Sequence, residues 1–194
     1  MVKEGKLIII CGPSGVGKKT IWTGLLDDKK YNTIFSVSMT TRPQRLGEIN
    51  GSDYYFVDFD AFQKAIRDGK LLEHAMFANN YYGTPKQPVY ENLKNGKNVF
   101  LEIEPQGVIQ ILNSFNKPEE IISIFIAPPK IEDLRQRLES RSTEPKEVIE
   151  SRIEQAKWEL TTASKFKYHI VNDDIEHAKL QLKKILDENL LNAK

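Results

Sequence analysis

The sequence predicts an α/β protein in which a parallel β-sheet is flanked by helices. Short apolar segments alternate along the chain with longer amphipathic segments, which is the order expected when strands and helices follow each other in a parallel sheet. The first near-continuous apolar run, which begins at Lys6 and ends at Cys11, leads directly into a glycine-rich turn and then into a helical pattern. A length of 194 residues with 40% hydrophobic content is enough for one well-packed core but hardly for two independent ones.

Apolar runs, together with capping and turn residues, predict where the individual strands and helices lie. Strands are expected at residues 6–10, 33–38, 53–56, 98–104, 121–127 and 168–172. Helices are expected from Lys18 with an apolar face of Ile21, Leu25 and Leu26, from a cap at Asp58 or Asp60 to Asp68, at 88–95, from Val108 to Leu112, within 131–162, and from Ile175. Residues 79–85, with adjacent tyrosines, form a turn-rich segment.

The glycine-rich turn after the first strand predicts a site for a polyphosphate. Glycines at 12, 15 and 17 let the backbone turn its N–H groups inward around phosphate, and Lys18 would reach the terminal phosphates. A flexible surface turn is the alternative. The position after Lys18 usually carries a hydroxyl for Mg²⁺, but here it is Lys19, so the hydroxyl can come only from Thr20. Lys19 either contacts phosphate or points to solvent.

Other polar residues stand where a phosphate ligand could use them. Arg42 and Arg45 flank Pro43 and are interpreted as a fork for a second phosphate, since guanidinium matches phosphate oxygens in pairs; a solvated loop is the alternative. Glu102 and Glu104 end an apolar strand, where open α/β sheets bind ligands. The helical segment after residue 130 carries Arg137, Arg141 and Arg152, which either form ion pairs on a solvated face or reach over phosphates.

Composition excludes several classes of function. The net charge of about +1 gives no reason to expect nucleic acid or an anionic membrane as a partner. No apolar run approaches the roughly 20 residues that span a bilayer, and no signal peptide is evident, so a cytoplasmic location is expected. The single cysteine, Cys11, is interpreted as a small core residue. The three histidines show no metal-ligand spacing.

The order of motifs resembles guanylate kinase over essentially the whole chain. The resemblance rests on these segments: Gly12-Pro13-Ser14-Gly15-Val16-Gly17-Lys18, Ser36-Val37-Ser38-Met39-Thr40-Thr41-Arg42-Pro43, Gly47-Glu48-Ile49-Asn50-Gly51, Asp53-Tyr54-Tyr55-Phe56-Val57, Asn80-Tyr81-Tyr82-Gly83-Thr84, Leu101-Glu102-Ile103-Glu104 with Gln106-Gly107, Ile126-Ala127-Pro128-Pro129 and Val171-Asn172-Asp173-Asp174. Each motif alone is modest, whereas the ordered set is highly specific.

The resemblance implies the P-loop NTPase fold in its nucleoside-monophosphate-kinase version. The core nucleotide-binding domain would comprise residues 1–38, 91–128 and 163–194, the GMP-binding insert residues 39–90 and the lid residues 129–162. The family transfers the γ-phosphate of ATP to GMP, and dGMP is expected to be accepted as well. Mg²⁺ accompanies ATP as the cofactor. The motifs do not decide between a monomer and a homo-oligomer.

The resemblance also assigns roles position by position. The ATP-binding residues would be Gly12, Pro13, Ser14, Gly15, Val16, Gly17, Lys18, Lys19, Thr20 and Asn172. The GMP-binding residues would be Ser38, Arg42, Arg45, Tyr54, Glu73, Tyr82, Thr84 and Glu104, of which Ser38, Glu73, Thr84 and Glu104 would read the guanine. The catalytic residues would be Lys18, Arg42, Arg137, Arg141 and Arg152.

Two departures from the family pattern concern the metal. The family strand end usually reads Asp-x-Asp, whereas this chain has Glu102 and Glu104, and Lys19 replaces a small residue. Mg²⁺ is therefore expected near Glu102 through water. A rival reading is a guanylate-kinase-like binding module that recognises phosphorylated ligands without catalysis. Such modules typically lose the phosphate loop and the serine matched by Ser38, both of which are intact here.

Overall fold

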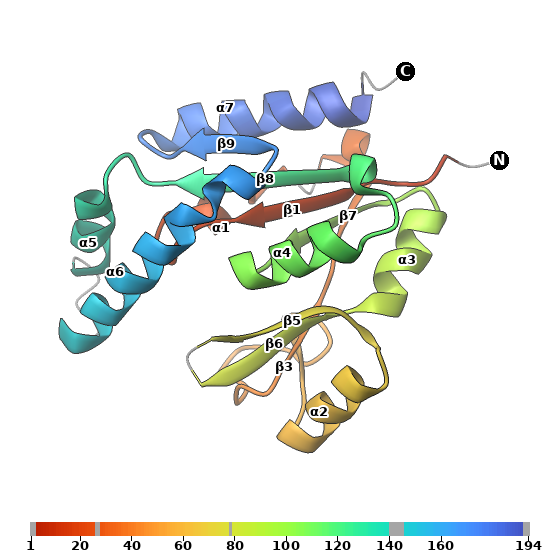
Figure 1. The fold of residues 1–194 in the computed structure, drawn as a ribbon. Coiled ribbons are helices and arrows are strands. Elements are labelled where there is room, and N and C mark those ends of the chain that lie inside the picture. The colour runs from red at the N-terminus through yellow and green to blue at the C-terminus, as the bar shows by residue number, and fades with distance from the viewer. Residues whose placement is uncertain (1–2, 26–27, 78, 140–145, 192–194) are drawn as a thin grey trace. The chain divides into compact units, whose positions relative to one another are not determined.

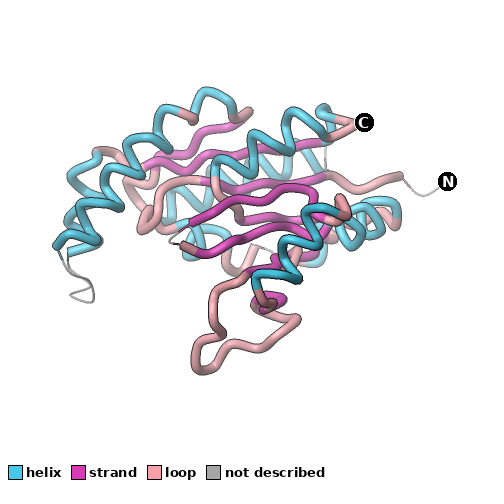
Figure 2. Tube along the Cα trace, turned by 60° about the horizontal axis from the view of Figure 1, so that its bottom comes forward, coloured by secondary structure: helices cyan, strands magenta, loops and turns pink. Residues whose placement is uncertain are grey.

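The protein forms two compact units. The computed structural model describes residues 3–25, 28–77, 79–139 and 146–191. The first unit contains the described residues of Met1–Leu7 and Ile34–Ile121, and the second unit contains those of Ile8–Thr33 and Ile122–Lys194. Figure 1 labels the helices and strands, and Figure 2 distinguishes them by colour.

A five-stranded sheet has the strand order β2-β7-β1-β8-β9. Its strands are β1 (Leu7–Cys11), β2 (Thr33–Phe35), β7 (Asn98–Glu102), β8 (Ile121–Ala127) and β9 (Tyr168–Val171). β8 and β9 are parallel, with Ile124 opposite Tyr168 and Ala127 opposite Val171. Every residue of β1, Cys11 included, is fully buried, as an uninterrupted apolar run predicts. The predicted parallel sheet flanked by helices is confirmed.

The α-helices of the second unit follow its strands along the chain. They are α1 (Lys18–Trp22), α5 (Ile131–Glu139), α6 (Lys146–Thr161) and α7 (Ile175–Leu186). α7 packs against α1 and β9, and its first turn is capped by Asp174, whose carboxylate accepts from the backbone N–H of His177 at 2.9 Å. α5 and α6 pack against each other through an apolar cluster of Leu134, Leu138, Ile149, Ile153 and Ala156.

A four-stranded sheet in the first unit has the order β4-β3-β6-β5. Its strands are β3 (Ser38–Thr40), β4 (Tyr54–Phe56), β5 (Leu71–Phe77) and β6 (Asn80–Pro85). β3 pairs parallel with β4 and antiparallel with β6, which pairs antiparallel with β5. The helices are α2 (Phe59–Arg67), α3 (Lys86–Lys94) and α4 (Pro105–Ser114); α2 and α4 contact β5, and Figure 1 shows them on opposite faces of this sheet.

Three of the predicted elements are wrong in extent or type. The strand expected at 33–38 is divided: β2 ends at Phe35, and β3 begins at Ser38 in the other sheet. Residues 80–85, expected to be turn-rich, form β6, because they pair on both sides with neighbouring strands. α1 ends at Trp22 rather than continuing through Leu25, because the chain takes a left-handed conformation at Gly24 (φ 85°). Leu26 lies outside the described residues.

The remaining elements agree with the prediction apart from their ends. Asp58 is the cap of α2 and accepts from the backbone N–H of Ala61 at 2.7 Å. β7 ends at Glu102, two residues earlier than expected, and Glu104 is already the N-cap of α4. α4 begins at Pro105 rather than at Val108, since proline suits the first turn of a helix.

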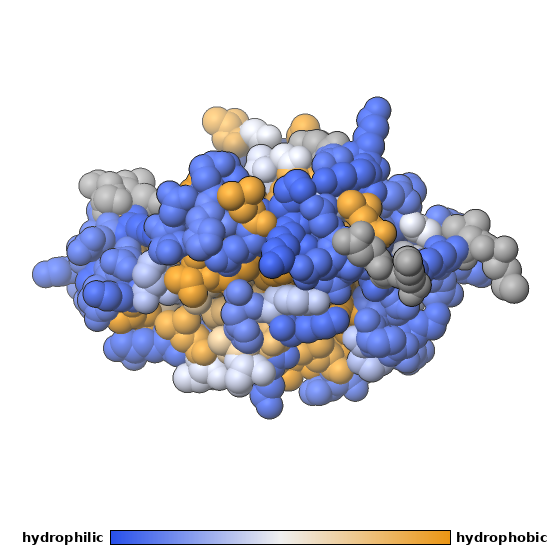
Figure 3. Space-filling view, turned by 90° about the horizontal axis from the view of Figure 1, so that it is seen from above, coloured by the Kyte–Doolittle hydropathy of each residue, from blue (hydrophilic) through white to orange (hydrophobic). Residues whose placement is uncertain are grey.

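Polar residues are prominent on one face of the protein (Figure 3). Figure 3 shows one face on which hydrophilic residues predominate and hydrophobic residues appear between them. Among the helices of the described residues, none has both the length and the apolar character needed to cross a bilayer.

Candidate active site

The glycine-rich turn joins β1 to α1 in the second unit. Gly12 and Gly17 have φ angles of 145° and 94°, and a Cβ atom would lie 2.1 Å from the carbonyl oxygen of Ile126 at Gly12 and 2.7 Å from Asn172 Nδ2 at Gly17. No other residue fits either position without displacing a neighbour. The backbone N–H of Val16 donates to the carbonyl of Pro13 at 3.2 Å, which closes the turn.

Lys18 folds back over this turn. Its Nζ donates to the carbonyl oxygen of Gly12 at 2.6 Å and to that of Pro13 at 3.2 Å. An ammonium group has three N–H donors, so one remains for a ligand oxygen after these two bonds. The turn therefore fixes a positive charge at the place where a polyphosphate would lie.

Side chains from distant parts of the second unit brace the same turn. Asn172, at the end of β9, donates from Nδ2 to the carbonyl of Val16 at 2.7 Å. Arg137 of α5 donates to the carbonyl of Asn172 at 3.0 Å and to that of Val16 at 3.4 Å. Arg152 of α6 donates to Ser14 Oγ at 3.1 Å. Two of the three predicted arginines thus contact the turn, and Arg141 lies outside the described residues.

Two cavities lie in the second unit, and the first of them adjoins the turn. One of about 430 Å³ is lined by Gly15, Gly17, Thr20, Arg137, Asn172, Asp173, Asp174 and Ile175. Another of about 450 Å³ shares Arg137 and Asp173 with it and is also lined by Pro129, Asp133 and Gln136. These volumes are within the range of small-molecule sites. Lys19 and Thr20 are both exposed, and Thr20 lines the first cavity.

The first unit holds a buried carboxylate. Glu73 on β5 is only 4% exposed, and its Oε1 accepts a hydrogen bond of 2.6 Å from the hydroxyl of Thr84, its partner on β6. Burial is the main reason that the pKa of Glu73 is raised to about 7; the hydrogen bonds from Thr84 oppose this rise, and the charge of Glu104 contributes to it. The site can therefore change from acid to carboxylate near neutral pH.

Arg42 is held by an ion pair next to β3. Its guanidinium donates to both oxygens of Glu48, at 2.6 and 3.1 Å, and lies over the rings of Tyr54 and Phe56 at 5.5 and 5.6 Å. Glu48 also accepts from the backbone N–H of Arg45 at 2.7 Å. The ion pair raises the pKa of Arg42 and lowers that of Glu48.

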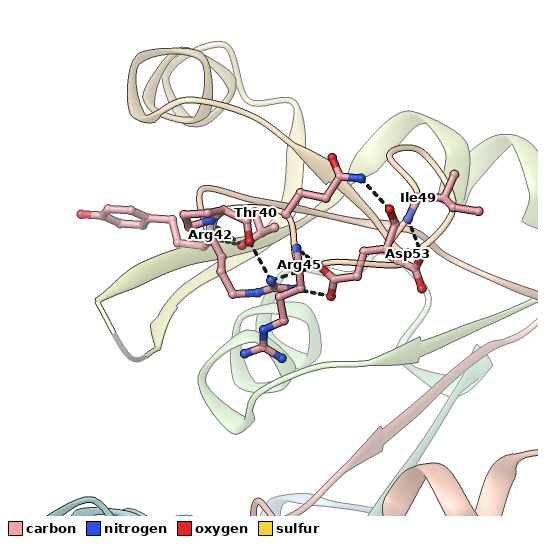
Figure 4. A network of polar contacts seen from close by, with 9 residues as sticks. Thr40, Arg42, Arg45, Ile49 and Asp53 are labelled. Atoms are coloured by element: carbon pink, nitrogen blue, oxygen red, sulfur yellow. Dashed lines mark hydrogen bonds and ion pairs between the residues drawn. The ribbon is translucent and has the colours of Figure 1, made fainter. Parts of the chain in front are cut away.

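Figure 4 shows this network of polar contacts around Arg42, with the side chain of Arg45 pointing away from it. The carboxylate of Asp53 accepts from the backbone N–H of Ile49 at 2.7 Å, which fixes the far end of the same loop. The loop that carries the two arginines is therefore ordered by its own carboxylates. Arg42 is held in place, whereas the guanidinium of Arg45 extends outward.

The adjacent tyrosines of β6, Tyr81 and Tyr82, contact different aromatic rings. Tyr81 packs against Phe59 and Phe62 of α2, with ring centroids 5.7 and 5.5 Å apart. Tyr82 faces the other side of the strand, where its ring meets that of Tyr54 at 6.0 Å. Burial, followed by the charges of Tyr82 and Glu102, raises the pKa of Tyr54. The two rings have different neighbours because successive side chains of a strand alternate between its faces.

The other predicted guanine-reading residues also belong to the first unit. Ser38 begins β3 and stands opposite Tyr54 in the register. Glu104 is close enough to Glu73 to raise its pKa. Glu102 ends β7, and its charge contributes to the raised pKa of Tyr54. The predicted GMP-binding residues and the predicted turn residues are thus two separate sets, one in each unit.

Comparison with known proteins identifies the family. The family model for guanylate kinase matches residues 4–189. This chain belongs to the guanylate kinase family. It is 48% identical over 192 residues to a guanylate kinase of Malacoplasma penetrans (strain HF-2), covering 99% of this chain and 97% of that protein.

Further relatives have the same name. A guanylate kinase of Lactococcus lactis subsp. lactis (strain IL1403) is 46% identical over 187 residues, covering 96% of this chain and 89% of that protein. The crystal structure of guanylate kinase from Anaplasma phagocytophilum has a TM-score of 0.76 at 31% identity, covering 98% of this chain and 89% of that one. The resemblance read from the motifs is confirmed.

Sequence reasoning missed some residues of this guanylate kinase site. Glu48 was part of a recognised motif but had no assigned role, although two nearby arginines called for a counter-charge. The contribution of Asp133 and Gln136 to the second cavity depends on how α5 packs, and no pattern in the sequence signals it.

Proposed function

We propose that this chain transfers the γ-phosphate of ATP to GMP, giving ADP and GDP. The observation that carries the proposal is the combination of the Lys18 turn with the buried Glu73–Thr84 pair. The turn supplies backbone N–H groups and a fixed ammonium for a polyphosphate. The pair supplies a carboxylate that can accept from both N1–H and the exocyclic amine of guanine, a combination that adenine does not offer.

In this proposal the two sets of residues bind different nucleotides. Gly12, Pro13, Ser14, Gly15, Val16, Gly17, Lys18, Lys19, Thr20 and Asn172 bind ATP. Ser38, Arg42, Arg45, Tyr54, Glu73, Tyr82, Thr84 and Glu104 bind GMP. The cavity of about 430 Å³ beside the turn, lined by Asn172, supports the ATP assignment. The placement of Arg42 beside Tyr54, and of Tyr82 against the same ring, supports a shared phosphate site.

The residues contribute charge and position rather than a proton acceptor. The acceptor is a phosphate oxygen of GMP that is already ionised at neutral pH, so the reaction needs no dedicated base. Phosphoryl transfer depends on alignment and on neutralising the charge of the transferred group. Lys18, Arg137 and Arg152, which contact the turn or its serine, supply that charge. Arg141 is part of the same proposal.

The residues near the turn fit Mg²⁺ that arrives with ATP. Mg²⁺ keeps several waters and is usually bound by one or two protein oxygens together with substrate phosphates. Thr20 lines the cavity, and among the described residues no group of three or more His, Cys, Asp or Glu could hold a metal on its own. We infer that Thr20 assists the ion, and the family resemblance implies a role for Glu102 through water. When bound, Mg²⁺ would neutralise charge on the β- and γ-phosphates.

A coupled assay with ATP and a panel of GMP, dGMP, AMP, CMP and UMP tests the proposal. GMP, with dGMP as a second substrate, should be phosphorylated far faster than the other three. Equal use of AMP would refute the assignment of Glu73. No turnover with any of them, combined with binding of a phosphorylated peptide, would favour a non-catalytic binding module. A cytoplasmic location and a place in purine nucleotide metabolism belong to the same proposal.

A further inference from the structure

Helix α4 makes an unusually close contact with the carboxylate of Glu73. A Cβ atom built on Gly107, in the first half of α4, would lie 2.1 Å from Glu73 Oε2 and 2.8 Å from its Cδ. The carboxylate thus rests against the helix backbone at the one residue of α4 that has no side chain. Its other oxygen, Oε1, accepts from Thr84. One oxygen is therefore held by β6, and the other is confined by α4.

A second contact joins the same helix to the residue after Glu73. The side-chain amide of Gln110 donates from Nε2 to the carbonyl of His74 at 2.7 Å and accepts from the N–H of His74 at 3.2 Å. Through this pair of bonds a side chain of α4 takes the place of a neighbouring strand. Gln110 thereby fixes the backbone of β5 one residue beyond the carboxylate.

α4 is itself firmly anchored in the first unit. Val108 and Ile111 are fully buried, and the backbone N–H groups of Gly107 and Val108 both donate to the carbonyl of Glu104. Because Glu104 caps this helix and its charge acts on Glu73, the start of α4 and the buried carboxylate form one local arrangement.

We propose that α4 positions Glu73 for guanine recognition, with Gly107 setting where the carboxylate lies and Gln110 fixing the strand that carries it. The proposal deepens the proposed function and rests on Glu73 reading guanine. Both residues are positioning residues, because they act through Glu73. A site that hydrogen-bonds two groups of a base tolerates only small displacements of the acceptor.

Substitution of Gly107 by alanine tests the idea without unfolding the chain. The atom in the way is the end of a flexible side chain rather than backbone, so the new methyl group displaces the carboxylate and leaves the helix intact. The dissociation constant of GMP, measured by calorimetry without ATP, should rise by about tenfold or more. The preference for GMP over IMP, which lacks the exocyclic amine, should shrink, while the KM for ATP stays unchanged.

A double-mutant cycle of Gly107→Ala and Glu73→Ala distinguishes an effect on the position of Glu73 from a general loss of stability. Glu73→Ala removes the carboxylate and opens space for the methyl group. In that background Gly107→Ala should therefore change GMP binding less than about twofold. Additive losses in the cycle would overturn the role of Gly107. Gln110→Leu keeps the shape but removes both bonds to His74, so it should weaken GMP binding severalfold, again with a loss of discrimination against IMP.

Matched controls come from the same unit. Gly5→Ala makes the same chemical change, but its Cβ meets the backbone carbonyl of Lys97 at 1.9 Å, so it should lower Tm and leave the GMP-to-IMP preference intact. Gln87→Leu removes only an exposed bond to Glu91 and should have no effect on GMP binding. Loss of preference in Gly5→Ala would show that instability alone explains the effect.

The proposed function has its own control. If the wild-type protein fails to prefer GMP over IMP, the reading of guanine by Glu73 is wrong. If the wild type shows the preference and the cycle is additive, only the role of α4 is wrong.

Discussion

Replacing Glu73 by glutamine should stabilise the folded protein at alkaline pH while weakening its hold on GMP. Burial raises the pKa of Glu73 from an ordinary value of 4.5 to about 7, so the folded state binds a proton more tightly than the unfolded state. The resulting stability is fully present below pH 4.5 and is lost as the pH rises through about 7. A change from 4.5 to about 7 corresponds to about 3 kcal/mol.

Glutamine keeps the acceptor for the Thr84 hydroxyl and carries no charge to desolvate. At pH 8 the variant should therefore be more stable than the wild type by about 3 kcal/mol, or roughly 6–12 °C in Tm for a chain of this size, and the two proteins should converge at pH 4. Denaturant unfolding of both proteins from pH 4 to 9 measures the difference. The other titrating groups are present in both proteins, so their contributions cancel in the difference between the two free energies of unfolding.

The same substitution should impair function because the amide offers a donor where guanine presents its own. GMP binding should fall by about a hundredfold, while ATP binding stays unchanged. Such a trade between stability and activity is expected where a charged group is buried for function. A variant that is equally stable at pH 8 would contradict the raised pKa. A variant that binds GMP normally would contradict the role of Glu73 whatever its stability.

Three further substitutions test other parts of the molecule. Lys18→Ala should lower kcat at least a hundredfold, because a fixed charge at a transferring group contributes about 3 kcal/mol or more; retention of a tenth of the wild-type kcat would refute this. Glu48→Gln removes the counter-charge that orients Arg42, so the KM for GMP should rise roughly tenfold with little change for ATP, as steady-state kinetics would reveal. Tyr31→Phe deletes the 2.6 Å bond to Asp187 and should lower the free energy of unfolding by about 1–2 kcal/mol at unchanged kcat; a kinetic effect would be unexpected.

The sequence was most informative where local chemistry decides the structure. An apolar run predicted the buried strand β1, and a capping aspartate at 58 or 60 predicted the start of α2, where Asp58 makes the capping bond. In the turn, glycines at 12 and 17 are required by backbone angles and by close neighbours. Such features depend on a few adjacent residues, so they can be read without knowledge of the tertiary fold.

Features that depend on pairing between distant segments could not be read in this way. Nothing within residues 33–38 signals that β2 and β3 join different sheets, because the partners of each strand lie far away in the chain. Similarly, Asn80–Pro85 has the composition of a turn, yet it becomes β6 between two partners. The role of Glu73 was inferred from the family resemblance, and its burial and bond to Thr84 arise only from the register of β5 and β6.

Arg42 and Glu73, which are both proposed to bind GMP, have different kinds of partner in the free protein. Arg42 is charged at neutral pH in any case, and Glu48 supplies the counter-charge that raises its pKa further. Glu73 has only the neutral donors of Thr84, and its pKa is raised to about 7. Guanine would supply the N–H donors that an ionised Glu73 lacks, so ionisation and GMP binding should favour each other. Binding at a pH somewhat below about 7 should therefore release a proton from Glu73. Calorimetry in buffers of different ionisation enthalpy measures the total release, to which the GMP phosphate, with a second pKa of about 6, also contributes. The part due to Glu73 should be missing in Glu73→Gln and should persist in Glu48→Gln.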